Sequence, residues 1–156
     1  MRCLFVSKIL IFTFSLLICF TAKGSNDKLL EWGNEHVTFC FASSRGYDLV
    51  GLKDLHTGRE ILDSNLQNHD IYNFWQVVLT DAEQQQITLS NHSKATVTYE
   101  TSEHKDGRKI TIYWKGICDK TGNACANVTV TGFLPVSASV AEWRISVTSQ
   151  VPYRVW

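Results

Sequence analysis

The sequence lacks the charge pattern of a nucleic-acid-binding protein and the long apolar run of a membrane-embedded one. Lysine and arginine, 15 in all, are balanced by 15 aspartates and glutamates, and no basic run concentrates them. Nucleic-acid-binding proteins carry a basic patch that neutralises phosphates, so the composition predicts no nucleic-acid partner. The apolar run at residues 9–20 is too short for a bilayer, which a helix needs ~20 residues to cross. We therefore expect no stable membrane span, above all once the signal peptide inferred below has been cleaved.

The motifs of several enzyme classes are also absent. The sequence contains no GxSxG elbow, no phosphate-binding glycine loop, no CxxC and no calcium loop. No histidine lies four residues from another, the spacing of the metalloprotease helix, and all but His36 are expected in solvated turns or loops. Asp70 follows His69 and is a candidate for orienting its imidazole, but adjacent residues of an extended chain point in opposite directions. We predict no metal and no cofactor, and the catalytic residues, if there are any, stay unknown.

The N-terminus has the pattern of a signal peptide. Arg2 and Lys8 precede the apolar run at 9–20, and the small-residue pattern Ala22-Lys23-Gly24 follows it. An uncleaved anchor is the weaker alternative, because the run is short. We predict a signal peptide at 1–24, a single β-sandwich domain at 25–156 and a secreted, periplasmic or extracellular location. The apolar C-terminal segment either docks on the core or leads into a longer chain, in which case the domain is truncated at its C-terminal end.

Cys40, Cys118 and Cys125 would remain after cleavage. Cys118 and Cys125 bracket DKTGNA, a run of turn-forming residues, so the spacing predicts a disulfide across a hairpin end in an oxidising compartment. A zinc site is the rival, but CxxxxxxC without a nearby histidine is not a zinc spacing. Cys40 lies among apolar residues and is predicted to be a buried thiol, although pairing with another chain stays open.

Alternating apolar and polar residues predict an all-β fold. The alternation recurs in short runs with turn-forming residues between them, and long helical patterns are lacking. Such strands predict an antiparallel β-sandwich, supersandwich-like and built from successive hairpins, or a barrel. The predicted strands cover 36–42, 73–80, 86–90, 95–100, 109–115, 127–133 and 142–149. An irregular segment or a short helix is expected at 63–72.

The stretch YDLVGLKDLHTGREIL, residues 47–62, has two interpretations. Its polar residues form either an acid/base group or the tip of a hairpin. Gly58 supplies the positive φ that a short hairpin loop requires, while Asp54 and Thr57 can bond to nearby backbone groups. We favour the hairpin, which places His56, Arg59 and other charged residues on an exposed rim.

Aromatic and threonine residues are the better indication of function. Flat rings stack on the apolar faces of sugars, and the candidate stacking residues are Tyr72, Tyr113 and Tyr153. The three tryptophans at predicted strand positions, by contrast, are expected in the core because buried aromatic rings dominate core energetics: Trp75, Trp114 and Trp143. Outward-facing threonines indicate either a sheet face covered by another molecule or simple strand propensity.

Two sequons, Asn91-His92-Ser93 and Asn127-Val128-Thr129, are glycan acceptors only in a eukaryotic secretory pathway. In a bacterium the same triplets carry no meaning.

Three segments together give the chain a family resemblance: HVTFCFASSRGYDLVGLKDLHTGREIL, YNFWQVVLT and AEWRISVTS. They resemble the N-terminal galactose-mutarotase-like β-supersandwich domain of large secreted glycoside-hydrolase-like proteins. The family's hairpin pattern L-x-D-x-x-T-G-x-E-L is matched by Leu52, Asp54, Thr57, Gly58, Glu60 and Ile61. Its strand pattern W-x-(I/L)-x-V is matched by Trp143, Ile145 and Val147, and the resemblance covers most of residues 29–151.

This resemblance implies a fragment that lacks the catalytic barrel beside which such domains pack. A non-catalytic, carbohydrate-associated domain is therefore the leading hypothesis, and the partners it implies are a carbohydrate and a catalytic barrel in a longer chain. The alternatives are a mutarotase-type sugar epimerase and a stand-alone extracytoplasmic structural or adhesion domain without a sugar site. Full mutarotases use a histidine and a glutamate, but neither maps onto a specific position of this sequence.

Overall fold

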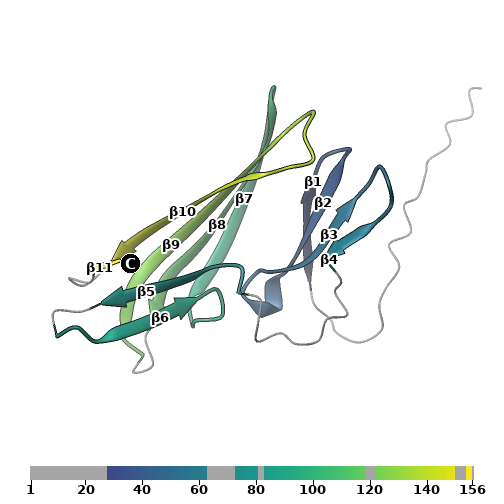
Figure 1. The fold of residues 1–156 in the computed structure, drawn as a ribbon. Coiled ribbons are helices and arrows are strands. Elements are labelled where there is room, and N and C mark those ends of the chain that lie inside the picture. The colour runs from purple at the N-terminus through teal and green to yellow at the C-terminus, as the bar shows by residue number, and fades with distance from the viewer. Residues whose placement is uncertain (1–27, 63–72, 81–82, 119–121, 150–153, 156) are drawn as a thin grey trace, which may run out of the picture.

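The computed structural model describes residues 28–62, 73–80, 83–118, 122–149 and 154–155. Within them the chain is an all-β, sandwich-like fold of antiparallel sheets (Figure 1). The predicted signal peptide and the segment at 63–72 lie outside the described residues. Among the described residues, no helix is long and apolar enough to cross a membrane.

The first sheet has the strand order β1-β2-β3-β4, in which each strand pairs with its neighbour in the sequence. Its elements are β1 (Leu29–Gly33), β2 (Val37–Ala42), β3 (Asp48–Asp54) and β4 (Glu60–Leu62), with the 3-10 turn η1 (Ser43–Arg45) between β2 and β3. The alternation in β2 is as predicted, with Val37, Phe39 and Phe41 buried. The sequence pattern did not predict β1, because its apolar residues do not alternate regularly.

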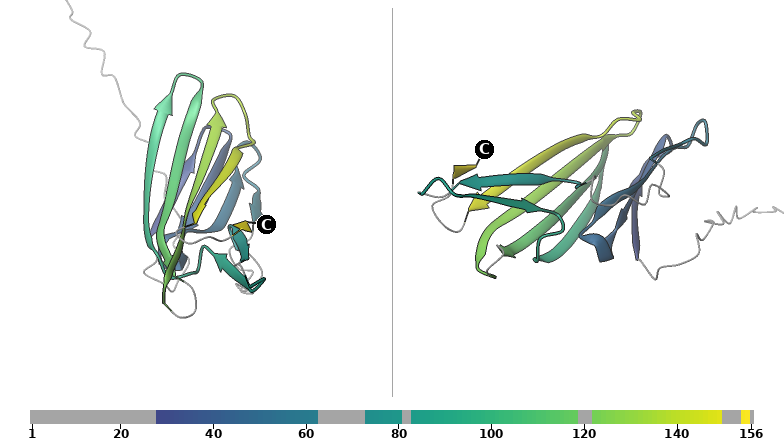
Figure 2. Two further views of the ribbon diagram at one scale, coloured as in Figure 1. Left: turned by 90° about the vertical axis from the view of Figure 1, so that its left-hand side faces the viewer. Right: turned by 60° about the horizontal axis from the view of Figure 1, so that its bottom comes forward.

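The remaining strands form two sheets. One has the order β10-β9-β8-β7 and the other the order β11-β5-β6. The larger sheet contains β7 (Thr96–His104), β8 (Gly107–Cys118), β9 (Ala124–Pro135) and β10 (Glu142–Ser149). The smaller contains β5 (Gln76–Thr80), β6 (Gln86–Ser90) and β11 (Arg154–Val155). Figure 2 shows the larger sheet as a broad layer, with the other two sheets beside it.

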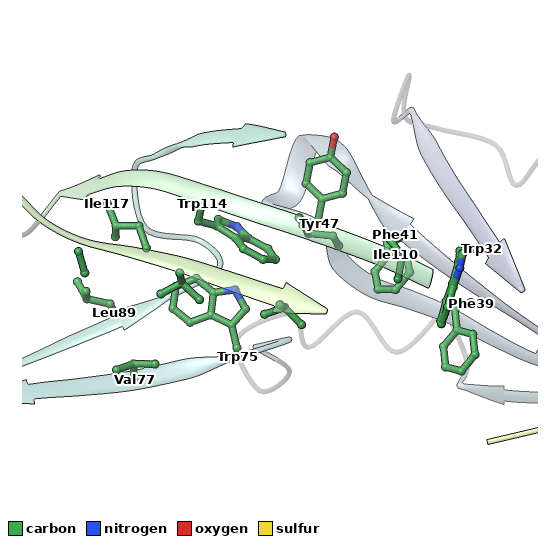
Figure 3. Close-up of a cluster of buried hydrophobic side chains, with 14 of the residues drawn as sticks. Trp32, Phe39, Phe41, Tyr47, Trp75, Val77, Leu89, Ile110, Trp114 and Ile117 are labelled. Atoms are coloured by element: carbon green, nitrogen blue, oxygen red, sulfur yellow. The ribbon is translucent and has the colours of Figure 1, made fainter. Parts of the chain in front are cut away.

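Aromatic rings join the three sheets into one core (Figure 3). Trp75, just before β5, meets Trp114 of β8 with ring centroids 5.3 Å apart and planes at 80°. Trp143 of β10 contacts Trp32 of β1 at 5.4 Å and Phe39 of β2 at 5.8 Å. Edge-to-face pairs of this kind stabilise by about 0.5–1.5 kcal/mol beyond the area they bury. The core prediction is confirmed for Trp75 and Trp114, and Trp143 packs against the core while half-buried.

Cys40 corrects one prediction. The sequence predicts a buried thiol, but Cys40 is half-buried, because it points to the face of β2 opposite Phe39 and Phe41. Its neighbour across the ladder is Gly51, where an added Cβ would lie 3.2 Å from the Cys40 Cβ. Alternation along β2 therefore decides the burial of Cys40, and the apolar character of its sequence neighbours does not.

The stretch at 47–62 is a hairpin, as predicted. Asp54 ends β3, and its Oδ1 accepts hydrogen bonds from the backbone N–H groups of His56 and Thr57 at 2.8 and 3.2 Å. The Thr57 hydroxyl donates to Asp54 Oδ2 at 2.8 Å, and these bonds lower the pKa of the Asp54 carboxyl. The two strands close the loop through a bond from Asp54 N to Arg59 O at 2.9 Å. The Asp54 and Thr57 side chains thus stabilise the turn.

Replacing Gly58 with valine should destabilise this hairpin. Gly58 has a φ of 71°, and no atom lies within 4 Å of the position that a Cβ would take, so backbone strain alone opposes the change. We expect a loss of about 1–2 kcal/mol in the free energy of unfolding, the usual cost of left-handed backbone for an L-residue. Urea denaturation measures it, with Arg59→Val as the control at an exposed neighbour. Equal stability of the two variants would contradict the positive-φ requirement.

Asn34 ties the β1–β2 turn to the β9–β10 turn. Its Oδ1 accepts hydrogen bonds from the backbone N–H groups of His36 and Val37, at 2.8 and 3.0 Å. Its Nδ2 donates to the carbonyl oxygens of Pro135 and Ala138, at 2.9 and 2.7 Å. One amide side chain therefore holds two turns that lie far apart in the sequence.

Candidate functional site

The sheet of β7–β10 has one face packed on the core and an opposite face, here called the outer face, that carries polar residues and rings. Its residues lie in rows across the four strands, because residues opposite one another in a ladder share a face. The first row is Thr98, Tyr113, Thr129 and Ser146; the second is Glu100, Thr111, Thr131 and Arg144; the third is Ser102, Lys109, Phe133 and Glu142. The threonines expected to face outward thus share one face of the sheet, on which Thr111 is buried among its neighbours.

Tyr113 lies in the middle of this face and is fixed by charged neighbours. Its hydroxyl donates a hydrogen bond to Glu100 Oε1, and the Lys115 Nζ lies 5.5 Å from the ring centroid, a cation–π distance. The hydrogen bond to Glu100 raises the pKa of the Tyr113 hydroxyl above its ordinary value of 10.0. Trp114, the next residue, points to the core, so β8 alternates as predicted.

A second ring lies further along the outer face. Phe133 lines a shallow hollow of about 270 Å³ together with Lys109, Thr131, Glu142 and Arg144. Thr129, the partner of Tyr113, is four residues before Phe133 on β9, which corresponds to roughly 13 Å along a strand. The face therefore offers two rings with charged and hydroxyl groups between them.

Tyr113 should titrate above its ordinary pKa, and its titration should depend on Glu100. Ionising the hydroxyl removes its hydrogen bond and places a second negative charge beside the carboxylate. The raised folded-state pKa means that the stability it contributes is present below the unfolded pKa near 10 and is lost as pH rises through the folded pKa. NMR of the Tyr113 ring against pH measures the midpoint. Glu100→Gln should lower it, whereas Glu103→Gln, elsewhere on β7, should leave it unchanged.

The other predicted site residues are less informative. Tyr72 and Tyr153 lie outside the described residues. Cys118 and Cys125 are present as thiols, whose Sγ atoms donate to the carbonyls of Gly116 and Ile117 at 3.3 Å each. The two cysteines are not opposite each other in the β8–β9 ladder: the register shifts between Ile117 and Cys118, and Cys118 pairs with Ala124. Their disulfide stays a prediction for the oxidised protein.

A polar group that sequence reasoning missed lies where two turns meet. Asp48, 2 % exposed, accepts a hydrogen bond at Oδ1 from Asn91 Nδ2 at 2.5 Å, and His92 Nε2 lies 3.1 Å from the same oxygen. Arg45 Nη2 lies 3.3 Å from Asp48 Oδ2. Asn91, 1 % exposed, also accepts a bond at Oδ1 from Phe74 N at 3.0 Å. This set, here called the Asp48 group, joins the η1 turn to the β6–β7 turn.

The Asp48 group bears on two predictions. His92 is an exposed turn residue, as the sequence predicts, and its ring also contacts a buried carboxylate, which the sequence does not predict. Asn91 is a glycan acceptor under a eukaryotic interpretation, yet its Nδ2 is buried and bonded to Asp48, so the folded protein has no room for a glycan there. The sequon at Asn127 differs, since Asn127 is half-buried and its Oδ1 accepts a bond from Gly116 N at 2.8 Å.

Where the structure describes them, the other histidines form no common site with His92. His36 Nε2 lies 3.5 Å from Glu35 Oε1, and the ring of His104 bonds to the Ser102 hydroxyl at 3.0 Å. His56 is exposed at the β3–β4 turn, and His69 lies outside the described residues. In the described part of the chain, no group of three or more His, Cys, Asp or Glu side chains is arranged to hold a metal ion.

Comparison with protein-family models, with curated proteins and with solved structures finds no match to this chain.

Proposed function

We propose that this chain is a secreted, non-catalytic, carbohydrate-associated β-sandwich domain whose outer face contacts the sugar. The observation that carries the proposal is the Tyr113 ring, fixed by Glu100 and Lys115 and surrounded by hydroxyl groups. A ring supplies an apolar surface for a sugar face, while threonine, carboxylate and ammonium groups supply donors and acceptors for sugar hydroxyls. The distance from Tyr113 to Phe133 suits a short oligosaccharide better than a single sugar.

The test is a titration of the purified protein with a panel of neutral oligosaccharides. Tyr113→Ala should weaken binding about tenfold, which corresponds to ~1.4 kcal/mol. The matched control is Tyr99→Ala: Tyr99 is also exposed, at 42 %, but lies on the opposite face of the neighbouring strand. Equal losses in both variants would contradict the outer-face site. Binding to no member of the panel would favour a structural or adhesion domain without a sugar site.

A mutarotase-type epimerase is the second candidate, and the pair of His92 and Asp48 is the observation in its favour. A carboxylate that fixes an imidazole is a common arrangement in general base catalysis. His92 lines a surface hollow at the junction of the η1 and β6–β7 turns. None of the described residues that line this hollow is an aspartate or glutamate that could serve as the acid, which argues against an epimerase. We therefore expect no acceleration of hexose anomerisation, measured by polarimetry; acceleration that His92→Ala abolishes would reverse the order of the two candidates.

A further inference from the structure

A hollow of about 290 Å³ lies at the junction of the η1 turn and the β6–β7 turn. Its lining includes Arg45, His92 and Lys94, together with hydroxyl groups of serines from both turns. Among the described lining residues there is no carboxylate. The hollow therefore presents hydrogen-bond donors together with the positive charges of Arg45 and Lys94, of which the Arg45 charge is paired with the Asp48 carboxylate.

The Asp48 group holds two of these side chains in place. Arg45 and His92 both contact the buried carboxylate of Asp48 while remaining partly exposed, with 29 % and 38 % of their side chains accessible. Arginine has five N–H donors in a fixed plane, and contact with Asp48 orients that plane. An arginine that is already ordered loses less conformational freedom when it binds an anion.

Ser93 and Lys94 add donors at the same opening. The Ser93 hydroxyl oxygen accepts a bond from Ser90 N at 3.0 Å, which leaves the hydroxyl proton to donate. The Lys94 backbone carbonyl accepts from Cys118 N at 3.0 Å, so the backbone is fixed while the side chain is exposed. Charge-assisted hydrogen bonds from arginine and lysine are the strong ones for carboxylate and phosphate oxygens.

We infer that this hollow is an oxyanion-binding site, which takes a sulfate, phosphate or carboxylate group between Arg45, Lys94 and the Ser93 hydroxyl. The group can belong to an acidic sugar or to a free inorganic ion, since both present the same oxygens. The site is separate from the outer face, so it stands or falls independently of the proposed carbohydrate contact at Tyr113.

The test is an amide NMR titration with sodium sulfate, sodium phosphate, glucuronate and glucose, with total ionic strength held constant by sodium chloride. We expect saturable shifts, confined to residues 43–46 and 91–95, for the three anions and none for glucose. Lys94→Gln should weaken sulfate binding about fivefold, a typical value for one exposed charge. Lys94→Glu should abolish the shifts. Lys115→Gln, which removes an exposed lysine on the outer face, should leave them unchanged.

The anion arms identify the source of the ligand. Tighter binding of glucuronate than of inorganic ions would indicate an acidic sugar, and equal or tighter binding of sulfate or phosphate would indicate a free ion. Shifts that spread over all basic surfaces, or equal losses in Lys94→Gln and Lys115→Gln, would overturn the inference, because general screening then explains the effect. The fold of each variant is checked by circular dichroism, and Lys94 is chosen because its side chain is exposed.

Discussion

Trp114→Ala is expected to lower the free energy of unfolding by about 3–5 kcal/mol, the usual cost of truncating a buried tryptophan. Trp114 is completely buried at the centre of the core, where its ring meets Trp75. Its Nε1 donates a hydrogen bond to the carbonyl of Gly46 at 3.3 Å, which an alanine cannot replace. A small domain has only about 5–15 kcal/mol of stability in total, so the variant should be partly unfolded at moderate temperature.

The matched control for this prediction is the adjacent residue. Tyr113→Ala also removes a ring from β8, but from the outer face, where we expect a loss of about 1 kcal/mol or less. Urea denaturation of both variants measures the difference. If Tyr113→Ala cost as much as Trp114→Ala, the assignment of the two faces of β8 would be wrong. Trp114→Phe should recover part of the stability, because it restores most of the ring volume while leaving the Gly46 carbonyl without its donor.

Asn91→Ala is expected to lower the free energy of unfolding by about 2–4 kcal/mol, since each buried polar group left unsatisfied costs about 1–3 kcal/mol. The substitution removes the donor to the buried Asp48 carboxylate and the acceptor of the Phe74 N–H. It also opens a small cavity where two turns meet. Thermal denaturation monitored by circular dichroism measures the loss.

Ser93→Ala separates this effect from glycosylation. The change destroys the same sequon but leaves the bonds of Asn91 in place, and it removes only the acceptor of Ser90 N. We expect a cost of about 1 kcal/mol or less, the value of one ordinary hydrogen bond. If Ser93→Ala were as destabilising as Asn91→Ala in protein from a eukaryotic host, and harmless in protein from a bacterial host, a glycan on Asn91 would be the source of stability instead.

Local patterns predict most strands of this protein well. Alternation along β8 separates Trp114 from Tyr113, and Asp54 with Gly58 predicts the β3–β4 turn, including the bonds from backbone N–H groups to the Asp54 side chain. Each of these signals lies within a few residues of chain, where period and turn chemistry act directly. The pattern missed β1 and the two-residue β11, which owe their existence to pairing with β2 and β5, and no local pattern reports such pairing.

The polar group around Asp48 is the part that sequence reasoning missed. Asp48 and Asn91 are separated by 43 positions, and each looks like an ordinary turn residue in its own segment. Their contact depends on how two turns dock, which is a property of the assembled sheets. The sequon at Asn91 gives no indication of this role, because a glycan acceptor requires an accessible side chain while the fold buries Asn91.

The Asn34 bonds have a consequence for the order in which this protein folds. They join positions 101 and 104 residues apart, from the first hairpin to the turn before β10. During synthesis on a ribosome, the first sheet thus emerges long before its docking partner, and Trp32 and Phe39 stay uncovered in the meantime. Long-range contacts of this kind are typical of chains that fold in milliseconds to seconds, so we expect the newly made chain to expose these apolar rings for longer than a helical chain of equal length does.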